Sequence, residues 1–137
     1  MFKKFDFSST MEKVDGLSVQ IVKIEGYLDS STFRQLKDHL QSLIDQEQYR
    51  IIVEFGRLNY ISSAGLGVLM GMLHEVRDNE GDLKLANMST KVRNLFDMLG
   101  FSRLIRIYDD CESAKQAFLD DQDKLAHKKP ILPEDDY

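Results

Sequence analysis

The order of secondary structure follows from one stretch of the sequence, residues 51–76, which reads IIVEFGRLNYISSAGLGVLMGMLHEV. Its first five residues form an apolar run without clean alternation, which is typical of a strand covered on both faces. Ser62 and Ser63 are good helix caps, and apolar residues follow them at helical spacing: Leu66, Leu69, Met70, Leu73 and Val76. We therefore predict a central strand, a link over residues 56–61, and an amphipathic helix that ends at residues 79–81.

The alternation of strand and helix extends in both directions from this stretch. Residues 17–25 and 83–86 predict strands, and residues 106–108 are strand-like. Helical spacing predicts three further helices, whose apolar residues are Phe33, Leu36, Leu40, Leu43 and Ile44, then Val92, Leu95, Phe96 and Leu99, then Ala114, Ala117 and Phe118. Strands that alternate with helices indicate βαβ crossovers, and hence an α/β fold with helices packed on a mostly parallel or mixed sheet.

The composition changes near the C-terminus. The chain has 137 residues, which suits one domain with a single core. From Asp120 onward there are six acidic and three basic residues, and Pro130 and Pro133 interrupt any helix. We predict a folded domain over residues 1–119 and a charged, solvated tail over residues 120–137.

Composition also excludes several classes of function. The chain carries 18 Lys and Arg against 23 Asp and Glu, and its net charge of -5 repels a phosphate backbone, so direct nucleic-acid binding is not expected. The lone Cys111 forms no intramolecular disulfide and offers no thiolate cluster for a metal, which fits a reducing compartment. The N-terminus lacks the apolar core of a signal peptide, and no run of 18 apolar residues occurs. A cytoplasmic protein without membrane insertion is expected.

No constellation of residues predicts catalysis. His39, His74 and His127 have no partner at a nucleophile-like turn, and the Ser62-Ser63 pair lacks a Gly-x-Ser-x-Gly elbow. Residues 65–71 form a GxGxxxG run that resembles a dinucleotide-binding turn, but Asn87 stands where the ribose-binding acid is expected. Nucleotide binding stays an alternative, and no metal or cofactor is expected.

The predicted helix after Ser63 has a distinct face opposite its apolar stripe. On a helical wheel, five residues fall opposite the apolar stripe: Ala64, Gly67, Val68, Gly71 and Glu75. Each glycine lowers helix stability by about 1 kcal/mol relative to Ala. An exposed face that stays flat at this cost suggests close approach by another surface next to Ser63. The alternative is that these glycines pack against a neighbouring element of the same chain.

Three segments resemble motifs of one known family. They are EGYLD at residues 25–29, similar to a Gly-x-Leu/Ile-Asp turn; NYISSAGLGVL at residues 59–69, similar to an Asp-Ser-Ser/Thr-Gly-Leu-Gly signature; and NLFDMLGFSRLIRIY at residues 94–108, similar to a third helix and last strand. Together they resemble the STAS domain (sulphate transporter and anti-sigma factor antagonist), especially the stand-alone bacterial antagonists, over roughly residues 3–119. The resemblance implies a single-domain STAS-like fold, with about four helices on a mixed sheet of about four to five strands.

The resemblance also implies a function. In that family, a serine at the start of the second helix is phosphorylated by a partner that is both an anti-sigma factor and a GHKL-type serine kinase. The unphosphorylated form sequesters this partner, which regulates transcription indirectly, and a PP2C-type phosphatase resets the switch. Alignment on residues 65–67 places the serine at Ser63, with Ser62 where the family usually has Asp and Ala64 where it has Ser or Thr.

The partner-binding surface implied by this resemblance consists of Asp29, Ser30, Ser62, Ser63, Ala64, Gly67, Val68 and Gly71. The alternative is a STAS scaffold or accessory subunit of a larger signalling or lipid-transport assembly. In that case Ser63 serves only as a helix cap.

Overall fold

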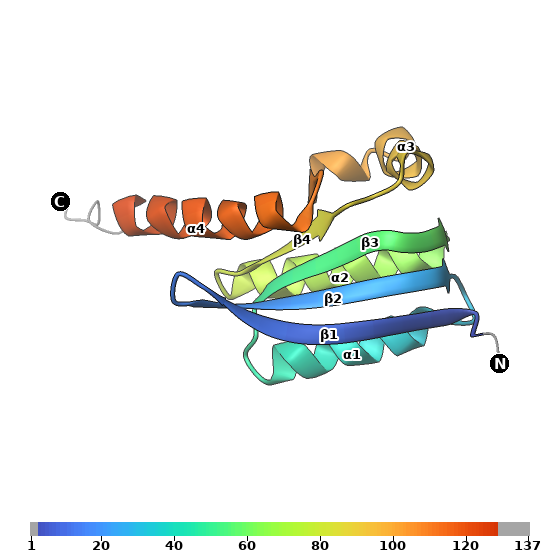
Figure 1. The fold of residues 1–137 in the computed structure, drawn as a ribbon, viewed down its shortest axis with the longest axis horizontal. Helices are drawn as coiled ribbons and strands as arrows, with labels where there is room; N and C mark the ends of the chain where they lie inside the picture. Colours follow the sequence, from blue (N-terminus) through green and yellow to red (C-terminus); the bar gives the residue numbers. More distant parts are fainter. Residues whose placement is uncertain (1–2, 129–137) are drawn as a thin grey trace.

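Five strands form one mixed sheet in a computed structural model that describes residues 3–128 (Figure 1). Strand order follows the sequence, β1-β2-β3-β4-β5. β1 pairs antiparallel with β2, and the remaining pairs are parallel. The strands are β1 (Phe5–Val14), β2 (Leu17–Leu28), β3 (Arg50–Ile61), β4 (Asp82–Ala86) and β5 (Arg106–Tyr108). The predicted α/β fold class is confirmed.

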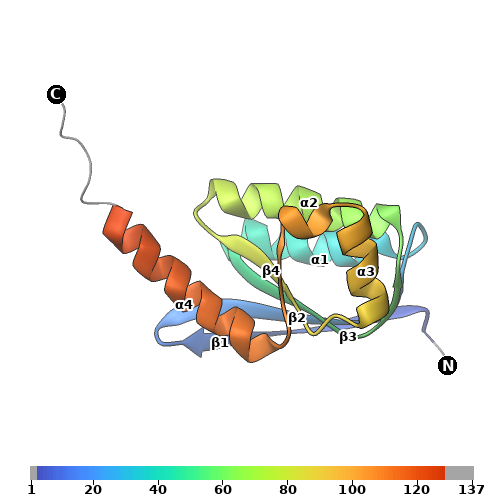
Figure 2. The same ribbon diagram turned by 90° about the horizontal axis from the view of Figure 1, so that it is seen from above.

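The helices cover the two faces of this sheet unequally (Figures 1 and 2). They are α1 (Phe33–Asp45), α2 (Ser63–Asp78), α3 (Thr90–Met98) and α4 (Cys111–Lys128), with a 3-10 turn at Phe101–Arg103. The first three contribute to the main core on one face. α4 contributes Ala114 and Phe118 to a smaller core on the other face. Within residues 3–128, no helix is long and apolar enough to cross a membrane.

Two strands differ from their prediction. The predicted link over residues 56–61 is wrong, because β3 continues to Ile61 and buries Leu58 and Ile61. Register shifts between β2 and β3 disturb the alternation there, which hid the strand in the sequence. β1 was not predicted at all. It joins β2 through Asp15 and Gly16, whose φ angles of 47° and 89° suit a two-residue hairpin turn.

The predicted boundary of the folded domain is also wrong. α4 continues through residue 128, so residues 120–128 do not begin a tail. Asp121 on α4 accepts a hydrogen bond from Lys84 on β4, with 2.6 Å between Nζ and Oδ2, and the Lys84 side chain is fully buried. Charged composition alone indicated solvation, but here a carboxylate pairs with a buried lysine. Residues 129–137, which include both prolines, lie outside the described residues.

Candidate functional site

Two turns meet where β2 and β3 end. Leu28 and Ile61 are register partners at the carboxyl ends of these parallel strands. The Ser62 N–H donates a hydrogen bond of 2.9 Å to the Leu28 carbonyl. This bond ties the turn that holds Asp29 and Ser30 to the start of α2, so these two predicted segments lie together.

The turn after β2 is fixed by its own side chains. Thr32 is buried; its hydroxyl donates to the Tyr27 carbonyl at 2.7 Å and accepts from the Asp29 N–H at 2.9 Å. Asp29 pairs with Lys4, with 2.7 Å between Oδ2 and Nζ, and also accepts from the Ser31 hydroxyl and N–H. The Lys4 ammonium, followed by Ser31, holds the pKa of Asp29 well below its usual range. Asp29 is therefore a fixed negative charge, and Ser30 beside it is exposed.

The start of α2 presents a free hydroxyl. Ser62 is the N-cap, in extended geometry, and its Oγ accepts from the Gly65 N–H at 3.4 Å. Ser63 is the first helical residue and is exposed, and among the described residues no hydrogen-bond partner is found for its Oγ. The structure describes every residue in the first turn of α2, and none of them is acidic. The positive end of the helix is thus open to an anion on Ser63.

The glycines of α2 have two different roles. A Cβ on Gly65 would lie 2.8 Å from Leu28 Cγ and 3.0 Å from Ile61 Cγ1, so this glycine lets the helix approach the strand ends closely. A Cβ on Gly67 or Gly71 would meet nothing within 4 Å, and both residues are exposed. Packing within the chain therefore does not explain Gly67 and Gly71, which form an open, flat strip beyond Ser63 and the half-buried Ala64.

Val68 does not lie on this exposed strip. It is only 6% exposed and belongs to the main core, so its predicted position on the outer face is wrong. α2 contacts α1 as well as the sheet, which buries a wider arc than a single apolar stripe implies. The buried residues of α2 are Gly65, Leu66, Val68, Leu69, Met72, Leu73 and Val76, while Met70 is partly buried.

The dinucleotide-binding alternative finds no support in this geometry. Residues 65–71 lie inside α2, which begins at Ser63, so these glycines form no turn ahead of the helix for a pyrophosphate to approach. Within residues 3–128, no group of three or more His, Cys, Asp or Glu side chains could hold a metal ion. What the site offers is an exposed serine hydroxyl at the start of a helix and an open strip of glycines beyond it.

Four further residues of this region were not among the predicted site residues. Lys4 and Thr32 hold the Asp29 turn, and no sequence signal links Lys4 to a residue so far along the chain. Tyr27 and Tyr60 are register partners that are 40% and 42% exposed, with ring centroids 6.4 Å apart. Exposed tyrosines are common anchors of protein interfaces. Their exposure follows from the register of β2 and β3, which the sequence alone does not reveal.

Comparison with known sequences shows which family this chain matches. The STAS domain model matches residues 9–114. BtrV of Bordetella bronchiseptica, whose name describes an anti-sigma factor antagonist, is 33% identical over 109 residues, which are 80% of this chain and 92% of BtrV. The anti-sigma F factor antagonist of Paenibacillus polymyxa is 28% identical over 93 residues, 67% of this chain and 80% of that protein.

Solved structures support the same fold. An anti-sigma factor antagonist from Mycobacterium paratuberculosis aligns with a TM-score of 0.71 at 17% identity, over 82% of this chain and 94% of that one. The Bacillus cell fate determinant SpoIIAA in its phosphorylated form aligns with a TM-score of 0.59 at 22% identity, over 80% of this chain and 99% of that one.

Proposed function

This chain belongs to the STAS domain family, and we propose that it is an anti-sigma factor antagonist whose binding is switched by phosphorylation of Ser63. Its named relatives antagonise anti-sigma factors, which is a role in binding rather than in catalysis. In the proposed cycle, the unphosphorylated chain sequesters an anti-sigma factor that is also a GHKL-type serine kinase. A PP2C-type phosphatase then restores the binding form, and all three proteins act in the cytoplasm.

The observation that carries this proposal is the exposed Ser63 hydroxyl at the start of α2. A kinase needs access to the hydroxyl, and the side chain has no competing hydrogen-bond partner among the described residues. The SpoIIAA structure, solved in a phosphorylated form, supports the idea that this fold tolerates a phosphate.

The strip formed by Gly67 and Gly71 supports a binding role next to Ser63. Glycine on an exposed helix face lowers helix stability by about 1 kcal/mol relative to Ala. A partner that packs closely on the strip would offset this cost. The proposed interface combines Asp29, Ser30, Ser62, Ser63, Ala64, Gly67 and Gly71, while Val68 supports the strip from the core beneath it.

The switch acts at this interface and not by unfolding. Phosphorylation adds a charge of about -1.5 to -2. A negative group at a helix N-terminus gains about 0.3 to 1 kcal/mol, so the free protein tolerates the phosphate. Burying the same phosphate against a partner without a matching cation costs several kcal/mol, and each 1.4 kcal/mol weakens binding about tenfold.

The test is to recover partners of the immobilised chain from native lysate, and then to incubate the chain with the recovered kinase and ATP. Mass spectrometry should place one phosphate on Ser63. Phosphate on Ser62 would move the switch by one residue. Recovery of a membrane-associated complex, with phosphate on neither serine, would support the scaffold or accessory-subunit function instead.

A further inference from the structure

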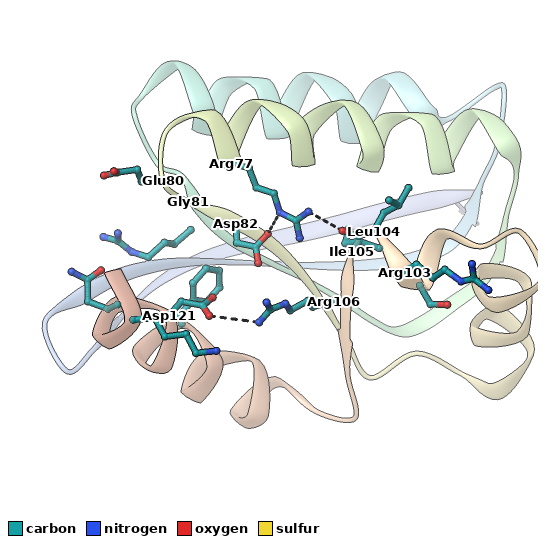
Figure 3. Close-up of a pocket in the computed structure, with 14 residues that line it drawn as sticks. Arg77, Glu80, Gly81, Asp82, Arg103, Leu104, Ile105, Arg106 and Asp121 are labelled. Atoms are coloured by element: carbon teal, nitrogen blue, oxygen red, sulfur yellow. Dashed lines mark hydrogen bonds and ion pairs between the residues drawn. The ribbon is translucent and has the colours of Figure 1, made fainter. Parts of the chain in front are cut away.

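A second candidate site lies far from Ser63. A cavity of about 450 Å³ opens beside Arg50, Asp82 and Arg106, the first residues of β3, β4 and β5 (Figure 3). Ser63 follows the opposite end of β3, and the 12 residues of that strand span roughly 36 Å at about 3.3 Å per residue. The cavity is therefore separate from the proposed phosphorylation site at Ser63.

The cavity walls carry an excess of positive charge. Five cationic side chains line it, against three anionic ones. They are Arg50, Arg77, Arg103, Arg106 and Lys124, against Glu80, Asp82 and Asp121. This excess of two positive charges occurs in a chain whose net charge is -5, so it is a local feature and not a reflection of composition.

Two of the three carboxylates are already engaged by cations. Asp82 is 2.9 Å from Arg77 Nε and 2.8 Å from Nζ of the buried Lys84. Asp121 is 2.6 Å from the same Lys84 Nζ, whereas its distance to the Arg106 guanidinium is 3.6 Å. Because the buried lysine takes the shorter contact to Asp121, the contact between Arg106 and this carboxylate is the weaker one, and the Tyr108 side chain also hydrogen-bonds Arg106. An incoming anion therefore competes for Arg106 with a long carboxylate contact and a neutral hydroxyl.

The arginines reach the cavity from different elements. Arg77, at the end of α2, donates to Asp82 and to the Leu104 carbonyl, which fixes its guanidinium against the wall. Arg106 extends from β5 toward Asp121 on α4, whereas Arg77 reaches from α2 toward Asp82 and Leu104 (Figure 3). Guanidinium groups bind phosphate and carboxylate oxygens in a planar, two-pronged geometry.

The size and charge of the cavity indicate a class of ligand. A volume of about 450 Å³ lies within the range of small-molecule pockets. Leu104 and Phe118 add apolar wall to the charged groups. A phosphate monoester carries about -1.5 to -2 charge near neutral pH, which matches the excess of two. We propose that this cavity binds a small organic phosphate, with Arg77 and Arg106 holding the phosphoryl group.

The assignment can be tested with three probes that share a benzene ring: phenyl phosphate as a dianion, benzoate as a monoanion and phenol as a neutral molecule. Amide chemical shifts of the purified chain would be followed during titration. Phenyl phosphate should cause saturable shifts confined to residues 77–82, 102–106 and 118–124. Benzoate should bind at least about tenfold more weakly, and phenol should cause no saturable shift there.

Variants identify the contribution of the arginines. Arg106→Gln should weaken phenyl phosphate binding by about tenfold or more, since it removes a charged donor. Arg34→Gln removes the same charge from the exposed surface of α1 and should leave binding unchanged. Should Arg106→Gln fail to fold, Arg103→Gln on the exposed 3-10 turn replaces it, and weaker binding is expected there too.

Three results would overturn the proposal. One is absence of saturable binding of phenyl phosphate. Another is equal binding of benzoate or phenol, which would remove the phosphate specificity. The last is equal weakening by Arg34→Gln and by the cavity variants, which would show a general charge effect. None of these results bears on Ser63, so the antagonist proposal is tested separately.

Discussion

The buried ammonium of Lys84 on β4 lies 2.6 Å from the Asp121 carboxylate on α4, and this contact joins the C-terminal helix to the sheet. Lys84 also contacts Asp82 at 2.8 Å and lies 4.6 Å from the centre of the Phe118 ring. Burial by itself would lower the pKa of Lys84, but hydrogen bonds to Asp121 and Asp82 outweigh it and raise the pKa. Lys84 is therefore charged in the folded protein and depends on both carboxylates.

Replacing Asp121 should loosen the attachment of α4. Asp121→Ala leaves Lys84 with Asp82 as its remaining carboxylate, and loss of a hydrogen bond to a charged group costs about 1.5 to 3 kcal/mol. We expect the free energy of unfolding, measured by urea denaturation, to fall by about 2 kcal/mol. Asp120→Ala removes the neighbouring exposed carboxylate and should change the free energy of unfolding by less than about 0.5 kcal/mol. Equal effects of the two variants would mean that the buried contact contributes little.

The Asp29 turn should show a defined pH dependence. The pKa of Asp29 is lowered by Lys4 and then by Ser31, so its contribution to stability is present above the unfolded value of 3.8 and is lost as pH falls toward the lower folded pKa. Near neutral pH, Asp29→Asn should be less stable than the unmodified chain. This difference should shrink as pH falls below 3.8.

Urea midpoints measured above and below that pH would check the Asp29 prediction. The control is Asp38→Asn on the exposed surface of α1, which should give nearly the same midpoint as the unmodified chain at every pH. A difference for Asp29→Asn that stays constant with pH would show that the charge of Asp29 is not responsible.

Arginine substitutions separate the outer strip of α2 from its buried side. Val68→Arg places a charge in the main core, so it should destabilise the protein severely. Gly71→Arg adds a side chain where nothing lies within 4 Å, so it should keep the melting temperature while weakening capture of the anti-sigma factor by about tenfold or more. Thermal denaturation and a pulldown would measure the two effects. Normal capture by a folded Gly71→Arg variant would exclude the glycine strip from the interface.

Variants of Ser63 test the proposed switch. Ser63→Asp should melt like the unmodified chain, because a negative charge is favourable at the start of a helix, but should bind the kinase far more weakly. Ser63→Ala should bind and resist phosphorylation. Ser62→Ala should still be phosphorylated, although loss of its N-cap costs about 1 kcal/mol. Binding titrations and mass spectrometry measure these outcomes, and tight binding by Ser63→Asp would contradict a switch based on charge.

Most elements could be predicted in type and order from the sequence, because these depend on local signals. Helical spacing located α1 and α2, and Ser62 marked the start of α2. Family motifs placed Ser63 at the start of the second helix. Each of these features arises from residues within a few positions of one another.

What each surface of an element contacts could not be predicted in the same way, because it depends on the packing of elements that are distant in the chain. Val68 looked exposed on a helical wheel, but α1 and the sheet together bury it. Asp121 looked like part of a solvated tail until β4 placed Lys84 against it. Lys4 and Asp29 meet because β2 runs back beside β1. The basic cavity likewise brings together residues as far apart in the chain as Arg50 and Lys124. Burial and charge pairing depend on residues distant in the chain, so no local pattern encodes them.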